Sequence, residues 1–225
     1  MKKPQIINLV SLIVCLFVFV STLIVVIMGV STGPEAAQPG AENMTGLGYF
    51  KAFTVDSNVF AGLITLIVGV YNLKNILQKR DEFPKWLVIL QMVSATAVAV
   101  TMMTTILFLG PTTVMEGHNY FWLFSGTLFF LHFLNPLLVI LIVMFILNKH
   151  HISWKESFFG VLPVFVYSLF YVPFIITGVW MDFYGFTFGG QMWAIPISIV
   201  VMLGVSYLFS FLISLVHNKF IKNNE

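Results

Sequence analysis

Charged residues are scarce in this chain: Asp, Glu, Lys and Arg make up only 9% of its 225 residues. A soluble domain of ordinary composition carries about 25%. Hydrophobic residues reach 59%, so the composition excludes a surface that is covered by water in the usual way. The net charge of +2 is small, and we therefore expect no nucleic-acid partner.

Cysteine is almost absent, since Cys15 is the only one. A single cysteine excludes a disulfide within the chain. The sequence also lacks a CxxC pair and a Cys/His zinc pattern. We therefore expect no metal site, and nothing in the sequence indicates a cofactor.

Six long apolar runs are present instead. Each can cross a hydrocarbon core of about 30 Å as a helix, and their continuous hydrophobicity is not the alternating pattern of barrel strands. The first run is too long for the core of a cleaved signal peptide. The sequence predicts an all-α polytopic membrane protein with six transmembrane helices in a single transmembrane domain, residues 1–225. The predicted helices cover about 6–30, 49–73, 86–109, 120–147, 158–176 and 193–216.

The basic residues predict the orientation. If the N-terminus lies inside, ten of the eleven Lys and Arg residues fall on the inner side and only Lys51 falls outside. Such a bias is typical of the cytoplasmic side. We expect an integral protein of the cell membrane with both termini cytoplasmic, and we expect Gly110-Pro111 to end the third helix.

Polar residues within a membrane helix indicate function by default, and the second run begins with several. Thr54, Ser57 and Asn58 are spaced i, i+3, i+4 and share one face. Gly62 continues this face and would let a neighbouring helix approach. The alternative interpretation is interhelical packing.

Two acids have roles that the sequence leaves open. Asp56 points away from the Thr54 face and could pair with Lys51. Asp182 lies in the aromatic loop before the sixth run.

The fourth run contains the only histidine well inside an apolar segment, His132. Pro136 lacks the N–H that would bond the His132 carbonyl, so we expect a kink. Counted from the inner lysines, His132 and Asn58 lie at similar depth. His132 could therefore act as a base for a Thr54 nucleophile, with Asn58 or Asn135 donating to the oxyanion.

Three segments, 53–58, 131–138 and 166–171, resemble a known family in the same order. It is the six-helix membrane family of androgen-induced and androgen-dependent threonine hydrolases, and the chain looks closer to its bacterial branch. The resemblance covers the second to fifth helices. It implies an intramembrane hydrolase of fatty acid esters, with Thr54 and His132 as catalytic pair and with membrane lipids and a lipid-like ester as partners. The surrounding residues differ, so the resemblance does not carry over the identity of the substrate.

Two tyrosines on the fifth run, Tyr167 and Tyr171, are spaced i, i+4 and are candidates for substrate binding. The alternative is that they are core or interfacial side chains. The loop 180–186 could cap the outer mouth or serve as an aromatic anchor.

Other functions remain open. A transporter would need polar residues through the bilayer, but the inner halves of the helices read as nearly all apolar. A haem or metal protein would need more than one deep histidine. A non-enzymatic lipid-binding or partner-binding protein fits the small residues of the third run. The oligomeric state and the physiological substrate are not predicted.

Overall fold

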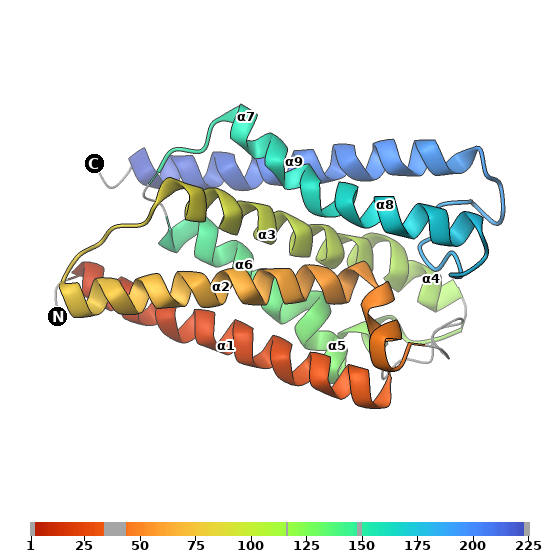
Figure 1. Cartoon of the computed structure of the whole chain (residues 1–225), viewed down its shortest axis with the longest axis horizontal. Coiled ribbons are helices and arrows are strands. Elements are labelled where there is room, and N and C mark those ends of the chain that lie inside the picture. The colour runs from red at the N-terminus through yellow and green to blue at the C-terminus, as the bar shows by residue number, and fades with distance from the viewer. Residues whose placement is uncertain (1–2, 34–43, 116, 148–149, 223–225) are drawn as a thin grey trace.

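The long helices of this chain pack side by side (Figure 1). The computed structural model describes residues 3–33, 44–115, 117–147 and 150–222. Within these ranges, six helical segments are long and apolar enough to cross a membrane. They confirm the prediction of an all-α membrane protein with six spans. The spans are Pro4–Thr32, Phe53–Gln78, Lys85–Met115, Gly126–Ile146, Trp154–Ile176 and Ala194–Ile221.

Several spans combine α-helix with 3₁₀- or π-helix. The α-helices are α1 (Lys3–Thr32), α2 (Phe53–Gln78), α3 (Lys85–Thr104), α4 (Gly110–Met115), α5 (Gly126–Phe129), α6 (Asn135–Leu141), α7 (Trp154–Ser157), α8 (Leu162–Ile176) and α9 (Ala194–Lys222). The π-helical segments are Thr105–Leu109, Phe130–Leu134 and Ile142–Ile146. The 3₁₀ segments are Gly46–Lys51, Tyr120–Phe124 and Phe158–Val161.

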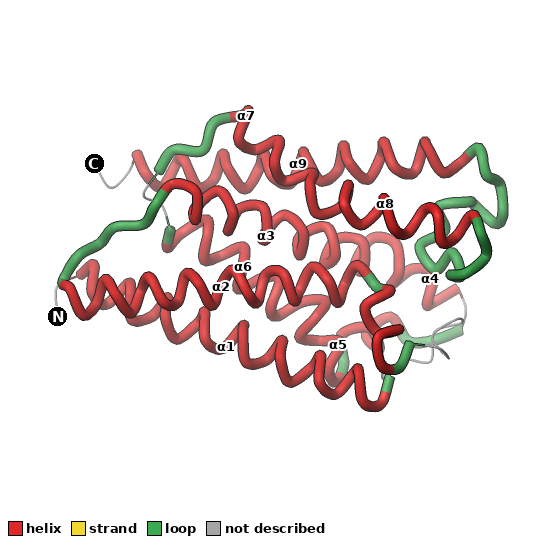
Figure 2. Tube along the Cα trace, viewed as in Figure 1, coloured by secondary structure: helices red, strands yellow, loops and turns green. Residues whose placement is uncertain are grey.

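The span that begins with α3 lies at the centre of the bundle. It is the most buried of the six, and α3 contacts α2, α6 and α9. The loops gather at the two ends of the bundle, and both termini lie at the same end (Figures 1 and 2). The end away from the termini carries the start of α2 and the loop between α8 and α9.

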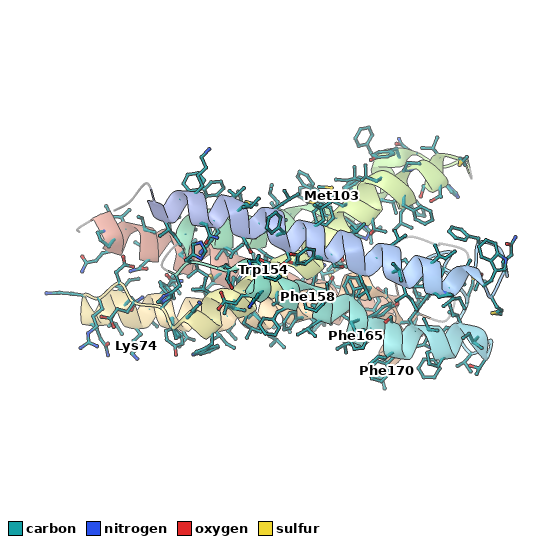
Figure 3. The ribbon with its side chains drawn as sticks, turned by 90° about the horizontal axis from the view of Figure 1, so that it is seen from above. Lys74, Met103, Trp154, Phe158, Phe165 and Phe170 are labelled. Carbon is teal, nitrogen blue, oxygen red and sulfur yellow. The ribbon has the colours of Figure 1, made fainter. Side chains whose placement is uncertain are left out.

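Large apolar side chains cover the outside of the bundle. Phe158, Phe165 and Phe170 follow one another along the fifth span (Figure 3) and are 63%, 44% and 59% exposed. Aromatic groups of this size at such exposure would be costly in water. This surface is therefore suited to contact with lipid.

The third helix does not end at Gly110-Pro111, so that prediction was wrong. The backbone widens into the π-helical turn Thr105–Leu109, in which the Gly110 N–H donates to the Thr105 carbonyl. Helix α4 then continues to Met115. Pro111 falls in its first turn, where a missing N–H is tolerated.

The fourth span starts later than the predicted residue 120. Tyr120–Phe124 form a separate 3₁₀ turn, Ser125 is extended, and α5 begins at Gly126 with a φ of +53°. A positive φ suits glycine because it has no Cβ. Hydrophobicity alone does not reveal this break.

The half of the bundle nearer the termini, which the sequence predicted to be the inner half, is more polar inside than the sequence suggested. The Ser157 hydroxyl donates to Ser214 Oγ over 2.9 Å, and the Ser210 hydroxyl donates to the Ser157 carbonyl over 2.6 Å. Both atoms of the Gln91 amide are buried without a hydrogen-bond partner among the described residues. The expectation of nearly apolar inner halves is corrected, since short hydroxyl side chains bonded to backbone do not stand out in an apolar run.

Candidate functional site

Thr54 lies in the first turn of α2, at the end of the bundle away from the termini. The preceding 3₁₀ turn ends at Lys51, and Ala52 is extended with a φ of −90° and a ψ of 125°. The Tyr167 hydroxyl from α8 donates to the Lys51 carbonyl over 2.6 Å. Tyr167 therefore fixes the point where the chain enters α2.

The Thr54 side chain borders a cavity of about 560 Å³, which we call the Thr54 cavity. Residues of α2, α3, α8, α9 and the loop before α9 line it. Its lining also includes Leu107, Phe188 and Val201, which are 71%, 61% and 55% exposed, so the cavity opens towards the lipid-facing surface. The polar side chains on its wall are Thr54, Thr101, Thr104, Tyr167, Ser168, Tyr184 and Ser198.

Tyr184 is the polar residue that faces Thr54 most directly. Its hydroxyl approaches the Thr54 side chain and the backbone of Phe53 and Thr54. Burial raises the pKa of Tyr184 to about 12, although these contacts partly oppose the shift. Like any tyrosine, Tyr184 carries its proton at neutral pH, so its hydroxyl is a hydrogen-bond donor at the wall of the cavity.

Asp182 holds the loop that carries Tyr184. Its carboxylate accepts hydrogen bonds from the Tyr171 hydroxyl over 2.9 Å, from the Phe186 N–H over 2.9 Å, and from the N–H and hydroxyl of Thr187 over 2.6 and 2.7 Å. Burial acts to raise the pKa of Asp182, but the hydrogen bonds from Thr187, Phe186 and Tyr171 outweigh it and lower the pKa. Asp182 is thus an ionised centre around which the loop folds.

Tyr171 connects this loop to α8. Its side chain is fully buried, and its hydroxyl also accepts from the Tyr184 N–H over 3.1 Å. Tyr167 and Tyr171 were expected to share a face, and their rings stack with centroids 5.3 Å apart. Tyr167 borders the Thr54 cavity, whereas Tyr171 supports the loop from behind.

His132 is buried in the π-helical segment Phe130–Leu134. Its Nδ1 lies 2.7 Å from the Leu123 carbonyl. A carbonyl oxygen only accepts, so Nδ1 carries the proton and the neutral ring keeps its lone pair on Nε2. Nε2 is therefore the atom that can act as a base. Where the sequence predicted a kink, the structure has this π-helix, in which the Asn135 N–H donates to the Phe130 carbonyl.

Asn58 connects the two helices that carry Thr54 and His132. Its side-chain amide donates to the Thr54 carbonyl over 2.8 Å and to the Leu131 carbonyl over 2.9 Å. The second bond confirms that Asn58 and His132 lie at similar depth. Both amide hydrogens are engaged, so Asn58 has no donor left for an oxyanion in this conformation.

Asn135 faces α1 and not the start of α2. Its Oδ1 accepts from the Ser21 hydroxyl over 2.8 Å, and its Nδ2 donates to the Thr22 hydroxyl over 3.1 Å. Thr22 also lies against Gly62, so small residues let α1 and α2 approach as expected.

Thr54 and His132 are not joined by a hydrogen bond in the described part of the chain, and His132 does not line the Thr54 cavity. The pair is connected through Asn58, which bonds to the backbone beside each of them.

Asp56 and Lys51 do not form the ion pair that the sequence allowed. Among the described residues, the ion pair that does form joins Lys85 and Glu156 over 2.7 Å, at the other end of the bundle. Asp56 and Lys51 both border a second cavity, on the other side of Phe53 and Tyr167 from the Thr54 cavity.

The sequence singled out the loop 180–186 as a possible cap but did not predict that Tyr184 would meet Thr54, and it did not indicate Thr101. Thr101 bonds Ser57 over 2.8 Å, and a threonine in the third run carries no distinguishing signal. The loop did carry a signal, because an Asp in a glycine-rich and aromatic-rich loop is suited to a turn held by side-chain bonds to backbone N–H groups.

Comparison of the chain with models of known protein families, with curated proteins and with solved structures finds no match in any of the three. Among the residues that the structure describes, no group of three His, Cys, Asp or Glu side chains lies close enough to hold a metal ion.

Proposed function

We propose that this chain is an intramembrane hydrolase of lipid-like esters, with Thr54 as nucleophile and His132 as general base. One observation carries the proposal: the Thr54 side chain borders an apolar cavity that opens to the lipid-facing surface, with the Tyr184 hydroxyl beside it. An ester with long apolar chains can enter such a cavity from the bilayer and bring its carbonyl to the hydroxyls.

The proposed chemistry needs a base. Thr54 Oγ attacks the ester carbonyl, its proton passes to Nε2 of His132, and the alcohol leaves with that proton. Water then hydrolyses the acyl-threonine and restores both side chains. A base acts directly or through one water, and its hydrogen bond is often long before substrate binds. The π-helical turn around His132 supports a local rearrangement of this kind, since such turns are frequent at functional sites.

Tyr184 is the candidate donor to the oxyanion. A tyrosine hydroxyl is protonated at neutral pH, and that of Tyr184 lies beside Thr54. A fixed donor in a dry cavity stabilises negative charge far better than one in water. This role replaces the one proposed for Asn58, whose donors are engaged.

We also propose that the end bearing the termini is cytoplasmic and that the protein resides in the cell membrane. Of the basic residues whose side chains are described, only Lys51 belongs to the opposite end. The positive-inside bias supports this orientation. The Thr54 cavity then lies near the outer side of the bilayer.

A second candidate is a lipid-binding protein without catalysis. The absence of a hydrogen bond between Thr54 and His132 in the described structure favours this lipid-binding function. The same cavity would then hold an intact lipid, with Thr54 and Tyr184 bonding its polar group.

Labelling by a fluorophosphonate distinguishes the hydrolase from the lipid-binding protein, because this probe phosphonylates activated hydroxyl nucleophiles. We expect purified wild-type protein to label and Thr54→Ala to lose labelling. His132→Gln keeps a donor for the Leu123 carbonyl but cannot act as the base, and we expect it to label about 100-fold more slowly or worse.

Thr65→Ala is the matched control, because Thr65 lies buried on the same helix and, within the described part of the chain, its hydroxyl bonds only to the α2 backbone. It should label like wild type. Thermal unfolding of each variant establishes that it is folded. Equal labelling of Thr54→Ala and wild type would exclude Thr54 as the nucleophile and leave the lipid-binding candidate.

A further inference from the structure

A second, larger cavity of about 1170 Å³ lies between α2, α3 and α8, and we call it the α8 groove. Lys51 and Asp56 border it at the start of α2, and Trp86 borders it at the start of α3. The Trp86 ring meets Tyr71 of α2 at 6.3 Å. Asp56 and Tyr71 are separated by about 22 Å along the helix axis at 1.5 Å per residue. The groove is thus longer than the hydrocarbon region of one leaflet, about 15 Å.

The groove opens on the lipid-facing surface. Phe159, Val166 and Phe170 of the fifth span line it and are 48%, 49% and 59% exposed. Nearly all of its other lining residues are apolar as well. A hydrocarbon chain is the kind of molecule that such a wall accommodates.

The polar end of the groove carries two ionisable side chains, Asp56 and Lys51, that have no ion-pair partner among the described residues. An ionisable group beside an apolar groove is costly unless it meets a polar or charged partner. A lipid headgroup with charges of both signs would complement a carboxylate and an ammonium that border the same groove.

We propose that the α8 groove binds a phospholipid with a primary-amine, zwitterionic headgroup, such as phosphatidylethanolamine. The ammonium donates to Asp56, the phosphate accepts from Lys51, and an acyl chain lies along α8. An anionic phospholipid headgroup that has no amine would leave Asp56 without a partner. A quaternary amine has no N–H to donate, so its bond to Asp56 is weaker.

This site is separate from the Thr54 cavity. The rings of Phe53 and Tyr167 stand between the two, with centroids 5.2 Å apart, and line both. The lipid site does not depend on Thr54 being a nucleophile, and Thr54→Ala should leave it intact.

Native mass spectrometry of the full-length, delipidated protein tests the proposal. The probes are diether forms of phosphatidylethanolamine, phosphatidylcholine and phosphatidylglycerol, which carry no ester to hydrolyse. We expect wild type to retain the ethanolamine lipid best, and we expect Asp56→Asn to lower its binding about tenfold or more. Asp56→Glu keeps the carboxylate and should keep the preference. Lys51→Gln should weaken the ethanolamine and glycerol lipids alike.

Lys74→Gln is the control for charge, because Lys74 lies on the same helix at the opposite end of the bundle (Figure 3). It should bind like wild type. Equal binding of the ethanolamine and choline lipids, no effect of Asp56→Asn, or no lipid retained by folded wild type would each overturn the proposal. Loss of labelling by Thr54→Ala with lipid binding unchanged would show that lipid binding in the α8 groove does not require the Thr54 hydroxyl.

Discussion

At the scale of single residues, Asp182 shows how one ionised group can shape a loop. Its two oxygens collect four hydrogen bonds from Tyr171, Phe186 and Thr187. The loop in turn brings Tyr184 against Thr54. The sequence left the role of Asp182 open, and the structure assigns it the support of this loop.

Acidification should release this loop only at low pH. The pKa of Asp182 is lower in the folded protein than in the unfolded chain, where it is about 3.9. Its contribution to stability is therefore complete above about pH 4 and is lost as the pH falls through the lower folded value. We expect hydrogen exchange of the Phe186 and Thr187 amides, corrected for intrinsic rates, to be constant between pH 5 and 8 and to rise only below about pH 4.

Asp182→Asn tests the same interaction without acid. A neutral amide is a weaker acceptor, so exchange at these two amides should become about tenfold faster at pH 7. Protection unchanged from wild type would show that the carboxylate does not hold the loop.

At the scale of elements, the sequence predicted the number and approximate position of the helices because lipid exposure leaves long apolar runs. The breaks within the runs were missed. Gly126 starts a new helix with a positive φ, and the π-turn before Gly110 lets the third span pass Pro111. Backbone irregularity of this kind depends on local hydrogen bonds that hydrophobicity does not report.

The candidate site was predictable in part for the same reason. Polar side chains are costly within a lipid-exposed helix, and for this reason the sequence indicated Thr54, Asn58 and His132. The predicted similar depth of Asn58 and His132 was confirmed. Their partners were not predictable, because the Leu123 carbonyl and the folded loop residue Tyr184 reach the site only through tertiary structure.

Close packing between elements gives a prediction at Gly160. A Cβ at this position would overlap the Cβ and Oγ of Ser210 on α9, and Thr96 of α3 lies 3.2 Å away. We expect Gly160→Ala to destabilise the folded protein by about 1–3 kcal/mol, because neither backbone can move freely. Thermal unfolding in detergent measures the effect.

Gly204→Ala is the matched control on α9. A Cβ at Gly204 meets no other atom within 4 Å, and alanine favours the helix by up to about 1 kcal/mol. This variant should be as stable as wild type or slightly more stable. A Gly160→Ala protein that unfolds at the wild-type temperature would contradict the packing argument.

At the scale of the whole molecule, both termini and most described basic residues lie at one end. The Thr54 cavity and the charged end of the α8 groove are associated with the start of α2, at the opposite end. The proposed orientation therefore places both binding regions towards the outer leaflet.

Cysteine labelling in intact cells tests this orientation. Cys15 is fully buried and should stay unlabelled. With an impermeant maleimide we expect Leu47→Cys, at an 88% exposed position, to label directly. Arg80→Cys, in the exposed loop after α2, should label only after the cells are opened. The reverse labelling pattern would show that the end bearing the termini faces the outside of the cell.

The shared wall of Phe53 and Tyr167 has a consequence for both cavities. A ligand that turns either ring in one cavity changes the shape of the other. Thermodynamic linkage requires such an effect to be reciprocal: if a lipid in the α8 groove changes the affinity of the Thr54 cavity for an ester, the ester changes the affinity for the lipid by the same factor. The lipid composition of the bilayer would then regulate how tightly the Thr54 cavity binds an ester.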